Sequence, residues 1–137
     1  MSDHPELCVG AIVVHEDRLL LVERGRGPGV GLWSVPGGRV ELAETMADAV
    51  RRELAEETGL DGTVDRVVGW VERIDAGHHF VIVDYLVRII DPSPARAGDD
   101  AASLRWVALA ELRRLPDVVP GLVDFLDEHG LLPPTSG

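Results

Sequence analysis

The chain has 137 residues, of which 45% are hydrophobic and 27% are charged. This length and composition predict one globular domain over 1–137, with a short flexible N-terminus at about 1–5 and a C-terminal tail at about 131–137. The net charge is −11, and all thirteen basic residues are arginine. Because an acidic surface repels nucleic-acid backbones, we expect no binding of duplex nucleic acid.

Membrane insertion and secretion are not predicted either. The chain has no apolar run of about 18 residues, the length that a transmembrane helix needs. The N-terminal stretch MSDHPELCVG lacks the basic start and apolar segment of a signal peptide. A single cysteine, Cys8, allows no intramolecular disulfide, and its apolar surroundings predict a small core side chain. We therefore expect a cytoplasmic protein.

The first part of the chain predicts a β-hairpin, a loop and a short strand. Two apolar runs, 7–14 and 18–23, are separated by the polar turn HED. A Gly/Pro-rich loop at 24–31 leads to a short strand at 32–35. We expect this strand to end in a turn at the sequence PGG.

An α-helix is predicted over 45–58. Its apolar stripe is Ala47, Val50 and Leu54, which recur at helical spacing. Its first residue, a threonine, suits the N-cap, and Gly59 suits the left-handed position that ends a helix.

The second part of the chain predicts two long strands around the turn DAGHH, a loop, a short strand and two short helices. In chain order these elements are 63–74, 79–90, 91–102, 104–107, 108–115 and 117–129. The last helix has as its apolar stripe Val118, Leu122, Phe125 and Leu126. With no internal repeat and no linker, the pattern predicts an α/β domain with a mixed sheet.

Three glutamates of the first helix stand out because they repel one another. Glu53, Glu56 and Glu57 are at i, i+3 and i+4, where each like-charged pair destabilises a helix by about 0.2–0.5 kcal/mol. They form a stripe beside the apolar face, so partial burial is expected, and partly buried carboxylates need compensation. Arg51 and Arg52 offer it, which leaves a surface helix with Glu/Arg pairs as one interpretation. A hard cation such as Mg²⁺ is the other.

The longer stretch GRVELAETMADAVRRELAEETGL, residues 38–60, resembles the signature of the Nudix hydrolases. That signature is Gly, five residues, Glu, seven residues, then Arg-Glu-aliphatic-x-Glu-Glu-x-Gly-aliphatic. All nine defined positions match: Gly38, Glu44, Arg52, Glu53, Leu54, Glu56, Glu57, Gly59 and Leu60. The resemblance implies an α/β/α sandwich around a central mixed sheet. It also implies hydrolysis of a nucleoside diphosphate linked to another group, X.

The resemblance implies a metal site for Mg²⁺ or Mn²⁺. Its ligands would be the carboxylates of Glu53, Glu56 and Glu57 and the carbonyl of Gly37. Arg52 matches the arginine that orients these glutamates, and Glu44 matches a supporting acid. Gly38 and Gly59 are expected to be structural, one for turn geometry and one for helix termination.

The catalytic residues implied in the same way are Glu53, Glu57, Arg52 and Asp100. The general base is left open between Glu57, Glu53 and Asp100. Asp100 follows Asp99 in the distal loop and stands six residues before Trp106, where many relatives have an acidic residue. A solvated acidic loop is the alternative for this pair.

Substrate contacts are expected from Arg24, for a phosphate, and from Trp33, for a base. The alternative for Arg24 is a surface ion pair, and the alternative for Trp33 is a position in the core. The stretch HHFVIVDY, with His78 and His79, and the stretch GDDAASLRWVALAEL resemble the ADP-ribose pyrophosphatase-like branch, from which Ser103 departs. ADP-ribose or a nucleoside diphosphate sugar is therefore the expected substrate. A (d)NTP pyrophosphatase that sanitises nucleotides is the second hypothesis.

Other classes are less well supported by the sequence. A nucleotide-sensing module of this family tends to lose the glutamates that this chain retains. An isoprenoid diphosphate isomerase needs a catalytic cysteine, and Cys8 is far in sequence from the glutamates. RNA decapping would need a basic surface, which this acidic sequence does not predict. Many relatives form homodimers, although no exposed apolar stripe marks an interface in this sequence.

Overall fold

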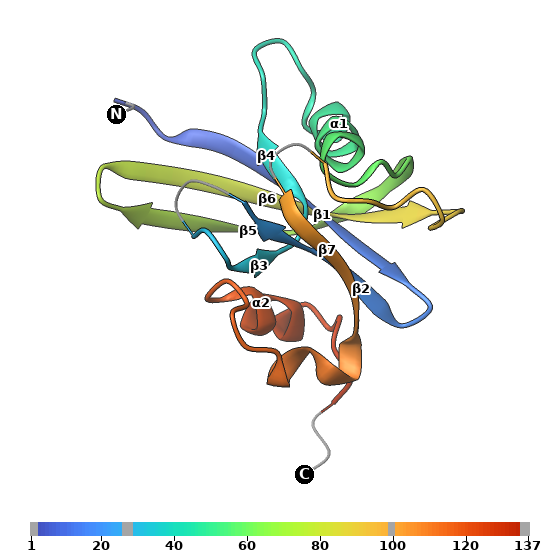
Figure 1. Cartoon of the computed structure of the whole chain (residues 1–137). Coiled ribbons are helices and arrows are strands. Elements are labelled where there is room, and N and C mark those ends of the chain that lie inside the picture. The colour runs from blue at the N-terminus through green and yellow to red at the C-terminus, as the bar shows by residue number, and fades with distance from the viewer. Residues whose placement is uncertain (1–2, 26–28, 99–100, 135–137) are drawn as a thin grey trace.

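The computed structural model describes residues 3–25, 29–98 and 101–134. It has seven strands, two α-helices and one 3-10 helix, η1, and the mixed sheet lies between helical layers as predicted (Figure 1). The elements are β1 Glu6–His15, β2 Arg18–Arg24, β3 Trp33–Ser34, β4 Gly37–Arg39, α1 Met46–Thr58, β5 Gly62–Asp75, β6 His78–Ile89, β7 Ala101–Ala108, η1 Leu109–Arg114 and α2 Leu122–Glu128.

The strand β1 is the centre of the sheet. The strand order is β3-β2-β1-β6-β5, with β4 paired to β1 and β7 paired to β2. One edge of β1 pairs with β6 in parallel, and the other edge pairs with β4 and then with β2 in antiparallel fashion. The remaining described pairs, β2–β3, β2–β7 and β5–β6, are antiparallel. A mixed sheet is therefore confirmed.

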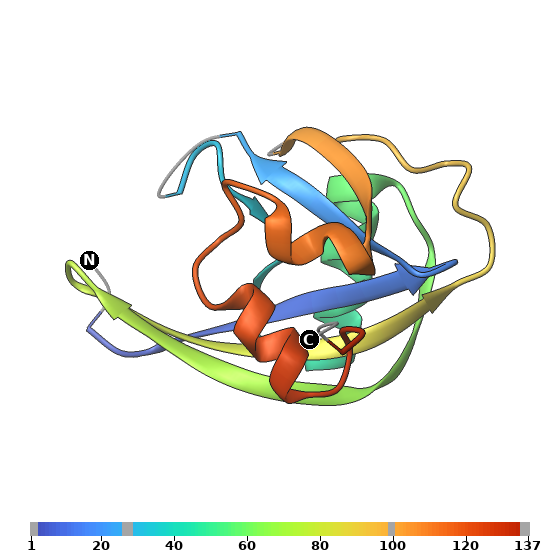
Figure 2. The ribbon, with the colours of Figure 1, turned by 90° about the horizontal axis from the view of Figure 1, so that it is seen from below.

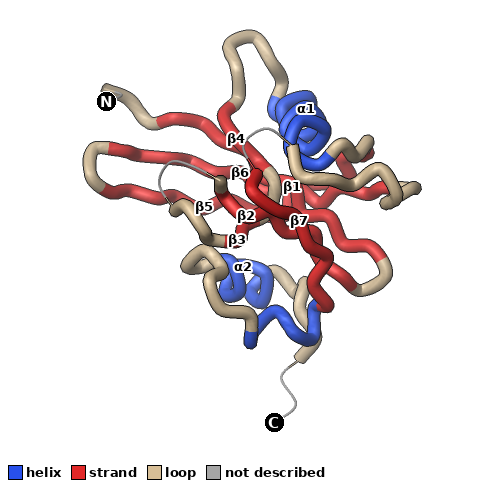
Figure 3. Tube along the Cα trace, viewed as in Figure 1, coloured by secondary structure: helices blue, strands red, loops and turns tan. Residues whose placement is uncertain are grey.

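Alternation along β1 divides the hydrophobic core between two faces. Successive side chains of a strand point to opposite faces. Val9, Ala11 and Val13 pack with α1 on one face, whereas Ile12 packs with α2 on the other. Figure 2, seen from below, shows α2 and η1 in front of the sheet, and Figure 3 shows α1 on the opposite side. We call these the α1 face and the α2 face.

Both predicted caps of α1 are confirmed. The Thr45 hydroxyl accepts a hydrogen bond from the Asp48 amide at 3.1 Å, and Gly59 has φ 75°. The apolar stripe differs from the prediction, because Ala49 is fully buried and Ala47 only partly. At about 100° per residue, Ala49 lies on the side of the helix that carries the glutamates. The helix therefore turns that side toward the sheet.

The turn predicted at PGG is instead the short strand β4. Gly37 is opposite Gly10 and Gly38 is opposite Val9 in the register with β1. A Cβ atom at Gly37 would collide with the backbone carbonyl of Val9. Glycine therefore allows β4 to approach β1 closely, a contact that local turn propensity does not reveal.

The last helix begins at Leu122, not at 117, and η1 takes the place of the first short helix. Pro120 has no amide hydrogen and disfavours a helical conformation for the residue before it. The preceding backbone pairs with Trp33 instead: the Trp33 amide donates to the Asp117 carbonyl at 2.7 Å, and the Val119 amide donates to the Trp33 carbonyl at 2.9 Å.

Two surface features also differ from the prediction. Leu132, placed in a flexible tail, is buried in the core cluster beneath α2. On β5, the strand at the end of the sheet order, Val67, Trp70 and Ile74 are exposed, whereas no exposed apolar stripe was expected. Among the described residues, no helix is long and apolar enough to cross a membrane.

The conformation of Gly59 generates a stability prediction. Gly59→Ala should lower the free energy of unfolding by about 1–2 kcal/mol, because an L-residue is strained in the left-handed region. The added Cβ would also lie 3.1 Å from the Pro94 carbonyl oxygen. Gly130→Ala is the matched control, with φ 72° and no atom within 4 Å of the added Cβ. Urea denaturation should show a larger loss for Gly59→Ala, and an equal or smaller loss would contradict the contact with Pro94.

Candidate active site

Arg52 joins α1 to the segment that follows β4. Its Nε and Nη2 atoms donate to the two oxygens of Glu44 at 2.7 and 3.0 Å, a bidentate pair. Nη2 also donates to the Arg39 carbonyl at 3.0 Å. The Arg52 and Glu44 side chains are 25% and 15% exposed, so this is a partly buried ion pair. The supporting role predicted for Glu44 fits this geometry.

The same guanidinium contacts two of the three clustered glutamates. Nη1 donates to Glu53 Oε1 at 2.8 Å and to Glu56 Oε2 at 3.3 Å. The Glu53 side chain is only 14% exposed, whereas Glu56 is 57% exposed. Arginine compensation, one of the two interpretations of this helix, is therefore present for Glu53 and Glu56. Arg51, the neighbouring arginine, is exposed, and its ion-pair partner among the described residues is Asp61, at 3.6 Å.

The two glycines of β4 lie against the other side of the cluster. The Gly37 amide donates to Glu57 Oε2 at 2.9 Å. A Cβ atom at Gly38 would lie 2.5 Å from the Glu53 carboxyl carbon. Gly38 was expected to serve turn geometry; instead, its lack of a side chain makes room for Glu53. Residues that are far apart in the sequence thus meet beside β4.

Charge and burial act against each other at Glu53. Burial raises the pKa of its carboxyl group, and the Arg52 hydrogen bond opposes this effect. At Glu44, the hydrogen bond from Arg52 lowers the pKa of the carboxyl group. The Arg52 pKa is raised, mainly by its hydrogen bond to Glu44. Glu53 is therefore a carboxylate whose ionised form would gain from additional positive charge nearby.

A hard divalent cation fits the donors at this site. Three carboxylates and a backbone carbonyl at β4 are the oxygen ligands that Mg²⁺ and Mn²⁺ prefer. With the side chains arranged as they are, no three acidic, histidine or cysteine side chains in the described part of the chain are close enough to hold a metal ion. Coordination would require Glu53 and Glu56 to turn their oxygens from Arg52 toward the cation.

Comparison with known proteins identifies the family. The family model described as NUDIX domain matches residues 4–128. The chain belongs to the Nudix family. It is a Nudix pyrophosphohydrolase, and Nudix hydrolases generally use divalent metal ions.

Two relatives and one solved structure show how similar this Nudix protein is to others. It is 36% identical over 115 residues to an ADP-ribose pyrophosphatase of Methanocaldococcus jannaschii, covering 82% of this chain and 67% of that protein. It is also 36% identical over 118 residues to a putative 8-oxo-dGTP diphosphatase 2 of Mycobacterium tuberculosis, covering 84% and 81%. A crystal structure of a MutT NUDIX hydrolase from Burkholderia pseudomallei matches with a TM-score of 0.82 and 31% identity, covering 93% and 99%.

The other predicted residues of this Nudix protein lie apart from the glutamates in sequence. Asp99 and Asp100 fall outside the described residues. Arg24 ends β2 and is exposed. Trp33 is partly buried against the α2-face core, and the Arg105 guanidinium lies 5.4 Å from the centre of its ring. The core interpretation of Trp33 is therefore correct in part, while base stacking stays a prediction.

The two histidines of the β5–β6 hairpin have structural partners. The His78 ring stacks on Phe80 with centroids 5.5 Å apart. The His79 Nε2 atom lies 2.9 Å from Glu72 Oε2 across the hairpin. Both histidines, predicted to lie in the turn DAGHH, are instead the first residues of β6.

Cys8 is closer to the site than its sequence position suggests. It shares the α2 face of β1 with Gly10 and Ile12, and it is partly buried. Burial raises the pKa of its thiol, and among the weaker influences Glu53 raises that pKa and Arg24 lowers it. Cys8 is thus within electrostatic reach of both residues. The register of β1 with β4, which sequence reasoning missed, accounts for this proximity.

Asp84 is the second residue that sequence reasoning missed. It is 6% exposed in the middle of β6, and its Oδ1 atom has no hydrogen-bond partner among the described residues. Burial raises the pKa of its carboxyl group to about 6, and Arg73 opposes the effect. One acidic residue inside the apolar run FVIVDYL was the available signal.

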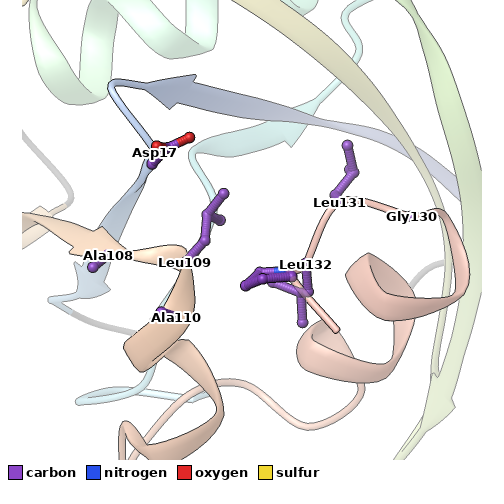
Figure 4. Close-up of a pocket in the computed structure, with 8 residues that line it drawn as sticks. Asp17, Ala108, Leu109, Ala110, Gly130, Leu131 and Leu132 are labelled. Carbon is purple, nitrogen blue, oxygen red and sulfur yellow. The ribbon is translucent and has the colours of Figure 1, made fainter. Parts of the chain in front are cut away.

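A separate hollow lies away from these residues (Figure 4). It has a volume of about 510 Å³ and lies between η1 and the C-terminal segment. Its lining is Asp17, Ala108, Leu109, Ala110, Gly130, Leu131, Leu132 and Pro133. Asp17 is the only ionisable residue in that lining, and no glutamate of α1 contributes to it. This hollow is therefore not the candidate active site.

The contacts of Arg52 predict that lysine cannot replace it. Arg52→Lys should lower the affinity for Mn²⁺ by about 10–100-fold, since a single ammonium group cannot hold Glu44 and Glu53 as the guanidinium does. Arg51→Lys, one residue away, should leave the affinity unchanged. Calorimetric titration of both folded variants measures the difference, and equal affinities would show that Arg52 does not position the glutamates.

The burial of Asp84 predicts a pH dependence of stability. Its ordinary pKa is 3.8 and its folded pKa is about 6, so the native state binds more protons between these values. The free energy of unfolding, relative to Asp84→Asn, should therefore fall by about 3 kcal/mol as pH rises from about 3 to about 7. Arg73 and His129, whose ring lies over the neighbouring Gly69, are present in both proteins. A difference independent of pH would contradict the shift.

Proposed function

We propose that the carboxylates of Glu53, Glu56 and Glu57 and the Gly37 carbonyl hold Mg²⁺ or Mn²⁺, and that this site hydrolyses a nucleoside diphosphate linked to another group. The observation that carries the proposal is the partly buried Glu53, held by Arg52 and accommodated by Gly38. Two further carboxylates lie on the same helix within its next turn. A solvated surface helix would not require these contacts with β4.

Each residue has a specific task in this proposal. Arg52 fixes Glu53 and Glu44, and the Gly37 amide orients Glu57. A divalent cation at this site would lower the pKa of water and neutralise diphosphate oxygens. Glu57 or Glu53 then takes the proton from the attacking water, and Asp100 is the third candidate for that role. Arg24 binds a phosphate, and Trp33 stacks on the base.

ADP-ribose or a nucleoside diphosphate sugar is the first candidate substrate. The named activity of the Methanocaldococcus jannaschii relative supports it. A (d)NTP, such as an oxidised dGTP, is the second candidate, supported by the Mycobacterium tuberculosis relative at the same 36% identity. The full set of signature glutamates, Glu53, Glu56 and Glu57, favours hydrolysis over a sensing role. A homodimer and a cytoplasmic location stay predictions.

Product analysis tests the hydrolase proposal. The protein would be incubated with Mg²⁺ and ADP-ribose, nucleotide sugars, dinucleoside polyphosphates or (d)NTPs, and the products separated by chromatography. We expect a nucleoside monophosphate from at least one compound, with ribose phosphate as the second product from ADP-ribose or pyrophosphate from a (d)NTP. Glu57→Gln should lower the rate by at least about a hundredfold, through the loss of a general base or a metal ligand.

Glu72→Gln is the matched control, because Glu72 is exposed on β5 and contacts His79. It should retain the full rate. Folded wild-type protein that binds one of the compounds but turns over none would contradict hydrolysis and favour a sensing module. Equal rates for Glu57→Gln and wild type would remove Glu57 from the proposed machinery.

A further inference from the structure

Asp84 lies between two glycines on the α2 face. In the register it is opposite Gly10 of β1 and opposite Gly69 of β5. A Cβ atom at Gly10 would collide with Asp84 Oδ1 and would lie 3.3 Å from Val35 Cγ2. The carboxyl group of Asp84 therefore lies over β1, beside Val35, in space that only a glycine leaves open.

Within the described residues, no hydrogen bond to the carboxyl group explains its burial. Oδ1 accepts no hydrogen bond within the described residues, although burial of an unpaired polar atom is costly. The His129 Nε2 atom lies 2.7 Å from the position that a Cβ atom would take at Gly69, and the His129 ring packs on Phe125. No hydrogen bond between His129 and Asp84 is present. Asp84 thus retains an acceptor for a partner that is not part of the described chain.

The register connects Asp84 to the candidate active site. Gly10, its neighbour on β1, is also opposite Gly37 of β4, whose amide holds Glu57. Asp84 and Gly37 are thus two strand spacings apart, about 10 Å. Cys8, one step along the same face of β1, is influenced by both Glu53 and Arg24. The distance between Asp84 and Gly37 is comparable with the length of a nucleoside monophosphate.

We propose that Asp84 recognises the nucleobase of the substrate and selects guanine. The inference rests on the proposed function and determines the base within it. An ionised carboxylate only accepts hydrogen bonds. Guanine presents two adjacent donors, N1–H and the N2 amino group, which can bond to the two carboxylate oxygens with charge assistance. Adenine presents one donor beside the N1 acceptor, which the second carboxylate oxygen would repel.

The surroundings of Asp84 suit a planar base. Val35 offers an apolar contact beside the carboxyl group, and Trp33 lies two residues earlier in the same segment and packs against the same core. The terminal torsion of an aspartate is broad and nearly two-fold, so either oxygen can be presented. The inference therefore favours guanine-bearing diphosphates over ADP-ribose, which is the first candidate when only the named activity of a relative is considered. Oxidation of guanine at C8 leaves both donors in place.

Binding of nucleoside monophosphates tests the inference without any hydrolysis. Calorimetry with wild-type protein, Mg²⁺ and GMP, IMP or AMP should give affinities in the order GMP, IMP, AMP. IMP retains N1–H but lacks the N2 amino group. GMP should bind at least about tenfold more tightly than AMP, as expected for one bidentate contact. Equal binding of GMP and AMP, tighter binding of AMP, or no binding of GMP would overturn the inference.

Asp84→Asn assigns the preference to this side chain. An asparagine amide accepts from the adenine amino group and donates to a ring nitrogen, so the ratio of GMP to AMP affinity should fall by at least about tenfold. Asp65→Asn, at an exposed position on β5, should leave the ratio unchanged. An unchanged ratio in folded Asp84→Asn would overturn the inference. If that variant does not fold, the three ligands with wild-type protein still decide the base preference.

The same data separate this inference from the proposed hydrolase function. Guanine selectivity without turnover of any compound would leave the role of Asp84 standing and would contradict hydrolysis. Turnover with no difference between guanine and adenine compounds would support hydrolysis and would contradict the role of Asp84. Paired substrates, dGTP with dATP and GDP-ribose with ADP-ribose, measure this directly as ratios of kcat/KM.

Discussion

The guanidinium of Arg52 makes five hydrogen bonds, and they fix the relative positions of α1, β4 and the segment between them. One cation on the helix holds Glu44 and the Arg39 carbonyl, which lie before the helix, and Glu53 and Glu56, which lie on it. Without this cation, the glutamates of α1 would repel one another beside a core that disfavours their charge. The family signature contains these residue types at this spacing, and the structure shows the contacts that they make with one another.

Close approach of backbone and side chain completes the site. Gly37 lets β4 pair tightly with β1, and Gly38 leaves space for the Glu53 carboxyl group. Because Gly37 also donates to Glu57, the strand that supplies the space supplies a hydrogen bond as well. The carboxylates therefore gather beside β4, the short strand that pairs with the central strand β1. In our proposal the same strand, through Gly10, gives the Asp84 carboxyl group room on the α2 face.

Features fixed by local chemistry could be predicted from the sequence. The hairpin, both caps of α1 and the long β5–β6 pair follow from turn residues, capping residues and hydrophobic period. Features that depend on distant contacts could not. The pairing of β4 with β1 overrides the turn propensity of PGG, and the bonds between Trp33 and the segment before Pro120 delay the start of α2. The burial of Asp84 depends on register partners in two other strands, which its own sequence neighbourhood does not encode.

The central claim, that the glutamates held by Arg52 bind a divalent cation, is tested most directly by anomalous diffraction from crystals grown with Mn²⁺. We predict an anomalous peak within coordination distance of Glu53, Glu56 and Glu57 and of the Gly37 carbonyl. Glu56 should have turned away from Arg52, while the Arg52–Glu44 pair remains. A crystal with Mn²⁺ at other positions and none beside these glutamates would contradict the claim. Arg52 would then be the cation that permanently compensates the cluster.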